Sequence, residues 1–217
     1  IRIARTYSKK ENIAFCGYHG WHDWYLAANL NKEDDLKTHL LPGLGTKGVL
    51  KKLKNTVFTF MFNDLKKLEK LIKNDVIGVI IMEVSRNYLP ENDFLKKVRD
   101  LANKNKIVLI FDECSSGFRE TFGGIHLKYD VNPDICMFGK ALGNGYAITS
   151  IIGKRKIMDK ASDSFISSTF WSERIGYVAG CKTLETMKKE KSWEYISKLG
   201  KELKKNCICF KLNTPTN

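Results

Sequence analysis

The stretch "KIVLIFDE", residues 106–113, decides the fold. Its apolar run has no polar alternation, which is typical of a strand buried on both faces, as in parallel sheets covered by helices. The run ends in two carboxylates, Asp112 and Glu113. Immediately before it, residues 91–105 place apolar side chains on one stripe at helical spacing, so the sequence predicts a helix that leads into this strand.

The same alternation extends in both directions along the chain. Short apolar or β-branched runs predict further strands at 12–16, 56–60, 76–83, 134–140 and 148–153. Amphipathic stretches predict helices that begin near Asp23 and at Asn63 or Asp64, and others over 172–191 and 193–205. Strands and helices that alternate in this way form βαβ units, so the fold class is α/β with a central, mostly parallel sheet flanked by helices.

The chain has 217 residues, of which 43% are hydrophobic, enough for a large core. No apolar run is long enough to span a bilayer, so we expect no membrane. The net charge is +13, but thirty of the 37 basic residues are lysines. Phosphate and base recognition favours arginine, and the lysines alternate with acids on helical faces, so we expect no nucleic-acid partner.

Six cysteines are scattered through the chain without the C-x-x-C spacing of a zinc or redox site. Most lie inside apolar runs, which indicates reduced, buried thiols and a cytoplasmic protein. Cys207 and Cys209 form a C-x-C pair near the end, which is a weak signal for metal binding. We therefore expect no metal.

Three charged residues follow three predicted strands: Glu83, Asp112 and Lys140. Asp112 lies 29 residues after Glu83, and Lys140 lies 28 after Asp112, which is one βαβ unit each. The carboxyl ends of parallel strands meet at one edge of the sheet, where open α/β sheets bind their ligands. The spacing therefore predicts that these three side chains line one site.

Lys140 stands out because it interrupts the apolar, glycine-rich stretch "CMFGKALGNGYAITSIIG", residues 136–153. Burial of a lone ammonium group is costly unless the group is paired or reacts, and a lysine against an apolar wall is suited to Schiff-base chemistry. A carboxylate such as Asp112 suits a protonated ring nitrogen, so the pair fits pyridoxal phosphate. A purely structural ion pair between Asp112 and Lys140 stays open as the alternative.

Five segments, in order, resemble the class III pyridoxal-phosphate aminotransferases, and especially the branch of glutamate-1-semialdehyde 2,1-aminomutase. The resemblance extends to about residue 200. These segments are "CGYHGWHDWY" (16–25), "IIMEVSRN" (80–87), "LIFDECSSGFR" (109–119), "PDICMFGKALGNGYAITSIIGKRKIM" (133–158) and "SSTFWSERIG" (167–176). The resemblance implies the large domain of a fold-type I pyridoxal-phosphate enzyme and a homodimer.

The resemblance also implies a role for each matching residue. Lys140 takes the place of the Schiff-base lysine, which also moves the substrate proton, and Asp112 that of the partner of the pyridine nitrogen. Tyr18 matches the aromatic residue that stacks on one ring face, and Cys114 occupies the position that packs against the other. Thr169 matches the residue that reaches a phosphate oxygen from the neighbouring subunit.

Four neighbouring positions are less clear from the sequence. Glu83 matches the carboxylate of the family's E-P motif near the ring, although Val84 replaces the proline. We count His19 with the cofactor-binding residues. His19 and His22 could be metal ligands only with a third partner, so packing or capping is favoured over metal binding for both. Ser115 stands where many relatives have a glutamine.

Arg119 is predicted to anchor the loop after Asp112. The chain starts with Ile1 and is shorter than members of this family, so we expect part of a longer protein that lacks half of the phosphate-binding cup. The predicted domains are the cofactor-binding large domain at 1–190 and the start of a small domain at 191–217.

The expected activity is transfer of an amino group between an amine or amino acid and a carbonyl acceptor through Lys140. Two alternatives stay open: transfer within one substrate, as in the aminomutase, and a truncated remnant without catalysis.

Overall fold

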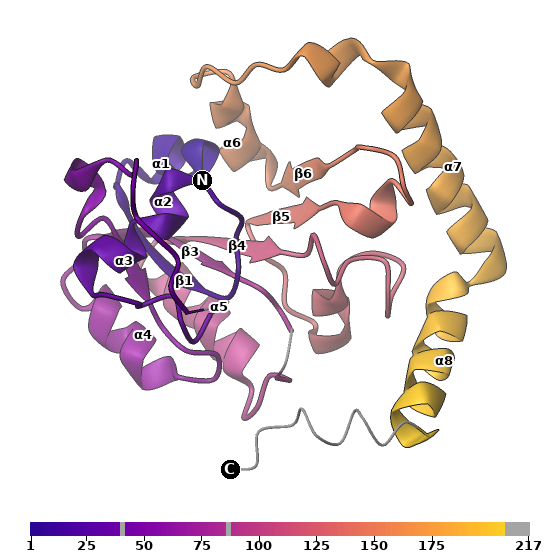
Figure 1. The fold of residues 1–217 in the computed structure, drawn as a ribbon, viewed down its shortest axis with the longest axis horizontal. Coiled ribbons are helices and arrows are strands. Elements are labelled where there is room, and N and C mark those ends of the chain that lie inside the picture. Colours follow the sequence, from indigo (N-terminus) through magenta and orange to yellow (C-terminus); the bar gives the residue numbers. More distant parts are fainter. Residues whose placement is uncertain (40–41, 86–87, 207–217) are drawn as a thin grey trace.

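The fold was described from a computed structural model, which describes residues 1–39, 42–85 and 88–206. Its sheet is six-stranded, in the order β2-β1-β3-β4-β5-β6 (Figure 1). The first five strands in this order are parallel, and β6 runs antiparallel to β5. The strands are β1 (Asn12–Cys16), β2 (Val57–Thr59), β3 (Ile77–Met82), β4 (Val108–Asp112), β5 (Ile135–Phe138) and β6 (Ser150–Gly153). The predicted strands and the α/β class are confirmed.

The helices lie on both faces of this sheet and beyond its edge. The α-helices are α1 (Arg2–Ser8), α2 (Asp23–Leu26), α3 (Ala28–Asn31), α4 (Leu65–Ile72), α5 (Phe94–Lys104), α6 (Arg155–Met158), α7 (Arg174–Glu190) and α8 (Ser192–Asn206). Short 3-10 turns are η1 (Lys51–Leu53), η2 (Ile125–Tyr129), η3 (Lys140–Leu142), η4 (Asp159–Ala161) and η5 (Thr169–Ser172).

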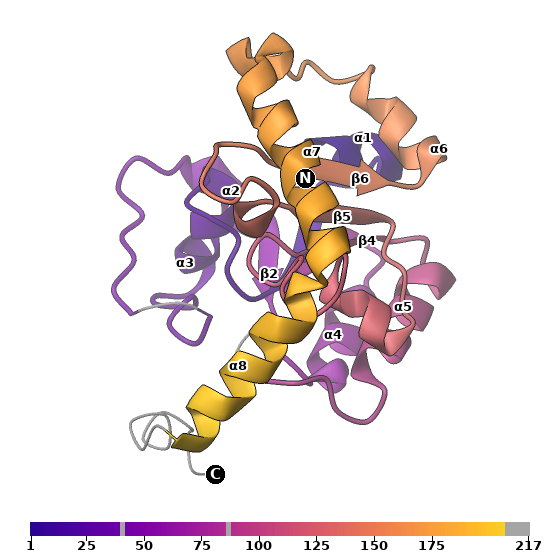
Figure 2. The same ribbon diagram turned by 90° about the vertical axis from the view of Figure 1, so that its right-hand side faces the viewer.

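Successive side chains of each strand supply two separate cores. In β1, Ile13 and Phe15 pack with α1, α2, α3 and α6 on one face, whereas Ala14 and Cys16 pack with α4 and α5 on the other. All of β3 is buried, as expected of a strand covered on both sides. Figures 1 and 2 show this three-layer arrangement. The continuous apolar runs of the sequence therefore mark the centre of a helix-covered sheet.

The helices differ in detail from the sequence-based expectation. Asp64 caps α4 as predicted, because its side chain accepts a hydrogen bond from the backbone N–H of Lys67 at 2.9 Å. The helix predicted from residue 91 instead begins at Phe94, because Asn92 and Asp93 adopt left-handed backbone angles, with φ of 49° and 57°. The helix expected near Asp23 forms as two short pieces, and α1 and α6 were not predicted.

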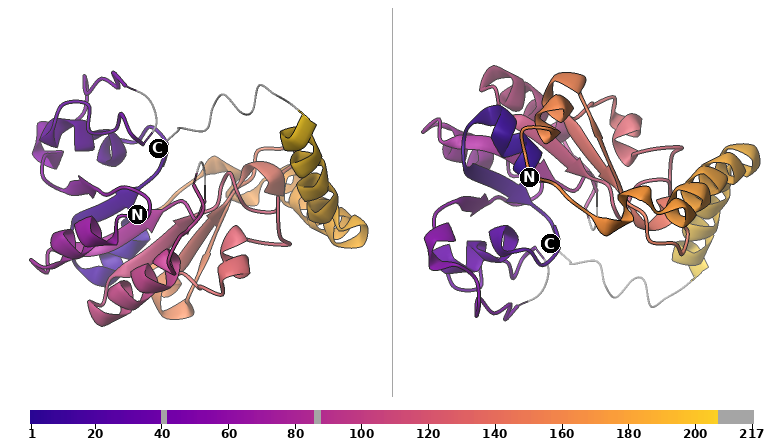
Figure 3. Two further views of the ribbon diagram at one scale, coloured as in Figure 1. Left: turned by 90° about the horizontal axis from the view of Figure 1, so that it is seen from below. Right: turned by 90° about the horizontal axis from the view of Figure 1, so that it is seen from above.

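α7 packs Leu184 and Met187 against the core that also contains α4 and α5, and α7 and α8 extend past the carboxyl ends of the parallel strands (Figure 3). Gly176 and Gly180 of α7 are buried where this helix approaches the segment after β5. None of the residues of α8 is buried. The proposed division into domains at residues 190 and 191 falls at the turn between these two helices and stays a prediction.

Candidate functional site

The order of the strands places a switch point between β1 and β3. From β1 the chain moves to β2 at one side, and then returns to place β3 on the other side of β1. Ligands of open α/β sheets bind outside the carboxyl ends of the strands at such points. Glu83, Asp112 and Lys140 all lie at this edge, directly after or at the end of β3, β4 and β5. The fold thus brings the three predicted strand ends together.

Glu83 connects the ends of β1 and β3. Its side chain is buried, and Oε2 accepts a hydrogen bond from the backbone N–H of Tyr18 at 3.0 Å. Gly17 makes this approach possible, because it has φ of 102° and a Cβ placed there would lie 2.6 Å from the same oxygen. The ring of Tyr18 meets Tyr25 edge to face at 5.9 Å. Tyr18 is therefore held by both its backbone and its ring.

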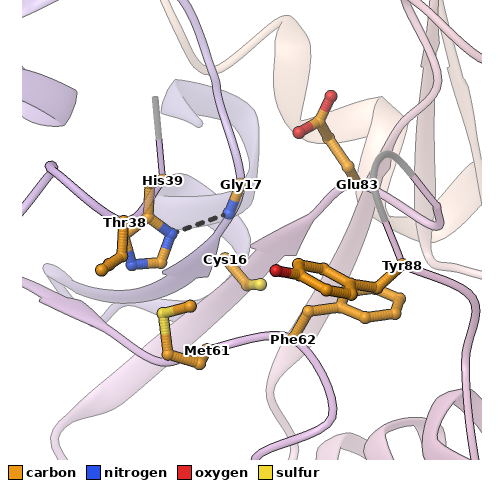
Figure 4. Close-up of a pocket in the computed structure, with 8 residues that line it drawn as sticks. All are labelled: Cys16, Gly17, Thr38, His39, Met61, Phe62, Glu83 and Tyr88. Atoms are coloured by element: carbon orange, nitrogen blue, oxygen red, sulfur yellow. Dashed lines mark hydrogen bonds between the residues drawn. The ribbon is translucent and has the colours of Figure 1, made fainter. Parts of the chain in front are cut away.

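A small pocket opens beside this contact (Figure 4). Its volume is about 60 Å³, whereas pockets for small molecules typically measure about 300–1,000 Å³. It is too small to hold a cofactor, and neither Asp112 nor Lys140 lines it. Its lining residues are Cys16, Gly17, Thr38, His39, Met61, Phe62, Glu83 and Tyr88.

Asp112 is ionised and held by two neighbours. Oδ2 is 2.9 Å from Nδ1 of His19, and Oδ1 accepts a hydrogen bond from the backbone N–H of Cys114 at 3.2 Å. Burial alone would raise the pKa of Asp112, but these hydrogen bonds and the charge of His19 outweigh it and lower the pKa below its usual value. The negatively charged carboxylate can therefore form an ion pair with a positively charged group of a ligand.

Cys114 is a thiol rather than a thiolate. Burial, followed by the negative charge of Asp112 and a hydrogen bond to it, raises the pKa of Cys114 to about 12, although Lys140 acts in the opposite direction. The Cys114 sulfur also lies close to the backbone before Lys140, since a Cβ on Gly139 would be 3.5 Å from it. Cys114 therefore sits between the carboxylate and the lysine as a small, uncharged neighbour.

Lys140 differs from the sequence-based expectation. It begins η3 with a left-handed φ of 44°, and its side chain is exposed rather than surrounded by core residues. Its Nζ donates a hydrogen bond to Oγ of Ser115. The expectation of burial was wrong because η3 turns the side chain away from the apolar residues on either side of it in sequence.

The structural ion pair between Asp112 and Lys140 is not formed in the described parts of the chain. Asp112 is paired with His19, and Lys140 with Ser115. The amine of Lys140 is therefore exposed and carries no carboxylate partner among the described residues, so a ligand can reach it. The loop 112–115 links the carboxylate to the lysine.

Three other positions that the sequence singled out are Thr169, Arg119 and the pair Cys207 and Cys209. Thr169 begins η5, in an exposed part of the chain. Arg119 donates from Nε to the carbonyl of Ser115 at 2.8 Å, as the predicted anchor of this loop. Cys207 and Cys209 lie outside the described residues.

The sequence did not reveal the role of Glu113. Its fully buried carboxylate accepts hydrogen bonds from Ser116, from the backbone N–H groups of Ile125 and His126, and from the His126 ring at 2.7 Å. With Cys136 these groups have the donor types of a metal site, but both carboxylate oxygens are already occupied. Glu113 instead stabilises the loop that carries Ser115 by hydrogen bonds to Ser116 in that loop and to Ile125 and His126 in η2. The one feature of the sequence that could have indicated this role is that Glu113 directly follows Asp112. Successive side chains of a strand face opposite sides of the sheet, so the two carboxylates were not expected to lie in the same site.

Comparison with known families and proteins agrees with this geometry. The family described as aminotransferase class-III matches residues 1–208. A 3-aminobutyryl-CoA aminotransferase of Cloacimonas acidaminovorans is 36% identical over 211 residues, which cover 93% of this chain and 47% of that protein. A glutamate-1-semialdehyde 2,1-aminomutase of Saccharolobus islandicus is 35% identical, over 94% of this chain and 49% of its own length.

Solved structures show the same fold. An omega-transaminase of Sphaerobacter thermophilus superposes with a TM-score of 0.73 at 25% identity, over 86% of this chain and 46% of the transaminase. The FumI protein of Sphingopyxis sp. MTA144, solved in a form that contains PLP, gives a TM-score of 0.73 at 23% identity, over 86% and 44% of the two chains. The chain thus spans about half the length of the curated relatives it matches.

Proposed function

This chain belongs to the class-III aminotransferases, and on that premise we propose that its site transfers an amino group between an amine or amino acid and a carbonyl acceptor with pyridoxal 5'-phosphate as cofactor. The observation that carries the proposal is the placement of Asp112 and Lys140 after neighbouring strands, at the ligand-binding edge of the sheet. An exposed amine and an ionised carboxylate are the two groups that this cofactor requires, and the amine of Lys140 is hydrogen-bonded to Ser115 in the loop that follows Asp112.

The side chains at this edge fit the cofactor. Bound pyridoxal phosphate supplies an aldehyde that a lysine can hold covalently and a ring that withdraws electrons from a substrate carbon. Because the pKa of Asp112 is lowered, its carboxylate is a weak base. A proton shared between this carboxylate and the ring nitrogen would therefore stay on the nitrogen. Lys140 would hold the cofactor and, as a free amine, would accept the proton from the substrate carbon and return it. Tyr18 and Cys114 would pack against the two faces of the ring.

Two further roles come from the resemblance alone. Thr169 would reach a phosphate oxygen of the cofactor in a neighbouring subunit, which requires a homodimer. Glu83 would stand near the ring and the substrate, where it also holds the backbone of Tyr18. His19 also belongs to the proposed cofactor site, where its Nδ1 lies 2.9 Å from Oδ2 of Asp112.

Transfer within a single substrate is the second candidate, because several of the relatives are glutamate-1-semialdehyde 2,1-aminomutases. Both reactions use the same lysine and carboxylate, so the residues named above do not separate them. A nitrogen-15 label on the amino group distinguishes the two reactions. A transaminase passes the label from a donor to a separate carbonyl compound, whereas a mutase keeps it in the same molecule.

We place the protein in the cytoplasm, in contact with small amines and carbonyl compounds, and we expect it to bind neither nucleic acid nor membrane. Cys16, Cys114, Cys136 and Cys181 are free in the described residues, which supports a reducing environment. Among the residues that the structure describes, no helix is both long and apolar enough to cross a bilayer.

The proposal is tested by incubating the chain with pyridoxal phosphate, a labelled amino donor and a carbonyl acceptor. We expect labelled product from the unchanged chain and none above background from Lys140→Ala. Lys154→Ala serves as the matched control, since Lys154 is bound to Asp134 at the opposite end of the sheet. Folded chain that retains the cofactor but transfers no label would support the remnant without catalysis instead.

A further inference from the structure

Three side chains from different segments hold the turn that carries Tyr18. The backbone N–H of Gly17 donates a hydrogen bond to Nδ1 of His39 at 3.2 Å (Figure 4). The carbonyl oxygen of Gly17 accepts one from the hydroxyl of Tyr25, also at 3.2 Å. The next N–H, that of Tyr18, donates to Oε2 of Glu83 at 3.0 Å. The path of the backbone at this turn therefore depends on side chains that lie elsewhere in the sequence.

His39 is fixed in position because its own segment is anchored. Its ring is buried and meets the ring of Phe15, in β1, at a centroid distance of 5.6 Å. The backbone N–H of His39 donates to the carbonyl oxygen of Leu36 at 2.9 Å. The N–H of Leu36 in turn donates to the side chain of Asn29, in α3, at 2.9 Å. The segment between α3 and β2 thus holds one nitrogen of His39 against the end of β1.

The contact with Gly17 requires a neutral His39 ring. The backbone N–H donates, so Nδ1 must accept and carries no hydrogen, whereas a protonated imidazole has a hydrogen on both nitrogens. Burial lowers the pKa of His39 below its usual value, while Asp35 opposes this shift and His19 adds to it. The ring therefore gains a proton only on the acid side of about pH 6.5.

Other titratable groups lie around His39, so its own titration has to be separated from theirs. Among the described residues these groups are Asp35, Cys16, His19, Glu83 and Tyr88. An asparagine in place of His39 achieves the separation, because its side-chain oxygen can accept a hydrogen bond near the position of Nδ1 and does not titrate. All the neighbouring groups are unchanged in this variant.

We propose that His39 is a positioning residue, whose neutral ring holds the backbone of Gly17 and thereby sets the place of Tyr18 against the cofactor ring. This inference rests on the proposed function, to which the stacking role of Tyr18 belongs. When acid protonates His39, Nδ1 gains a hydrogen and can no longer accept one from Gly17. One of the three side-chain contacts of the turn is then lost, so the site should bind the cofactor less tightly.

The contact itself is tested by NMR on the chain without the cofactor. Nitrogen-15 labelling allows the amide of Gly17 and the ring nitrogens of His39 to be followed from about pH 8 to about pH 5. At the start we expect no hydrogen on Nδ1 of His39, and both sets of signals should change together as the pH falls. A hydrogen on Nδ1 at the start, or a Gly17 amide that does not follow His39, would overturn the inference.

Two variants sharpen this measurement. In His39→Asn the Gly17 amide should keep its hydrogen-bonded signal over the whole pH range, because the acceptor does not titrate. His22→Asn is the matched control, since the exposed side chain of His22 stacks on Trp21 in the same segment as the turn. Its Gly17 amide should titrate as in the unchanged chain. A Gly17 amide that still titrates in His39→Asn would assign the change to a neighbouring group and overturn the inference.

The role toward the cofactor is tested by the affinity for pyridoxal phosphate. Loss of one hydrogen bond should weaken binding by about fivefold in folded His39→Ala at neutral pH, and His39→Asn should restore the affinity. Acidification to about pH 5 should weaken binding in the unchanged chain by about the same factor more than in His39→Asn.

Equal affinities of folded His39→Ala and the unchanged chain would overturn the role, even if the contact exists. Should His39→Ala not fold, His39→Asn decides, and an equal loss of affinity in acid for this variant and the unchanged chain would overturn the role. If the unchanged chain does not bind pyridoxal phosphate, the proposed function fails, whereas the NMR result still decides whether His39 holds Gly17. The two failures are therefore distinguishable.

Discussion

Single residues at the edge of the sheet have properties that their sequence neighbours do not show. Lys140 lies between Gly139 and Ala141 and was expected to be buried, but its left-handed φ directs it outward to Ser115. His19 is predicted to bind the cofactor, and nothing in the sequence indicated its contact with Asp112. Both contacts depend on the direction of the backbone after a strand end, which composition and periodicity do not encode. The positions of the charges were predictable, and their contacts were not.

At the scale of the residue, Cys114 should react slowly with alkylating reagents. Its pKa of about 12 leaves about one molecule in ten thousand as thiolate at pH 8. Cys181 is exposed on α7, so we expect iodoacetamide to modify it at least about a hundredfold faster. Peptide mapping over time measures both rates. In urea the two sites should react alike, and equal rates in the folded chain would contradict this account of Cys114.

At the scale of the element, the contact between the ends of β1 and β3 depends on Gly17. Gly17→Ala adds the strain of a positive φ and a clash with the Glu83 carboxylate, so we expect a loss of about 3 kcal/mol in the free energy of unfolding. Gly145→Ala is the matched control, because Gly145 has φ of 105° with nothing within 4 Å of an added Cβ. It should cost only about 1 kcal/mol. Equal losses in urea denaturation would show that the Glu83 contact does not constrain Gly17.

The elements themselves were largely predictable. Continuous apolar runs such as 76–83 can be buried only between two layers, so the sequence determined the central strands and the α/β class. α1 and α6 escaped prediction because each is short and takes its stability from packing against the other and the sheet. The antiparallel direction of β6 also depends on the path of the chain after Lys140, which has no local sequence signal.

At the scale of the whole molecule, Asp134 joins parts that are far apart in the chain. Its buried carboxylate accepts hydrogen bonds from Arg99 of α5, from the backbone of Leu109 in β4 and from Lys154 after β6. Burial would raise the pKa of Asp134, but these partners outweigh it and lower the pKa. The carboxylate thus ties one helix and three strands together at the end of the sheet opposite the site.

This arrangement predicts how stability depends on pH. A carboxylate whose pKa is lower in the folded chain stabilises the fold above its unfolded pKa of about 3.9, and this stability is lost as the pH falls through the folded value. We therefore expect the urea midpoint to fall with acidification below about pH 4, and to fall less steeply in Asp134→Asn, which should be less stable at neutral pH. A variant that loses stability with acid as steeply as the unchanged chain would rule out this role for Asp134.

The central claim is that Lys140 bears the cofactor, and borohydride reduction followed by peptide mapping tests it most directly. The chain is mixed with pyridoxal phosphate, reduced and digested, and the modified lysine is identified by mass spectrometry, with Lys140→Ala treated in parallel. We predict one stoichiometric label, on Lys140, together with a visible absorbance band that reduction removes and that Lys140→Ala lacks. A label spread over many surface lysines, or a band that persists in Lys140→Ala, would contradict the account.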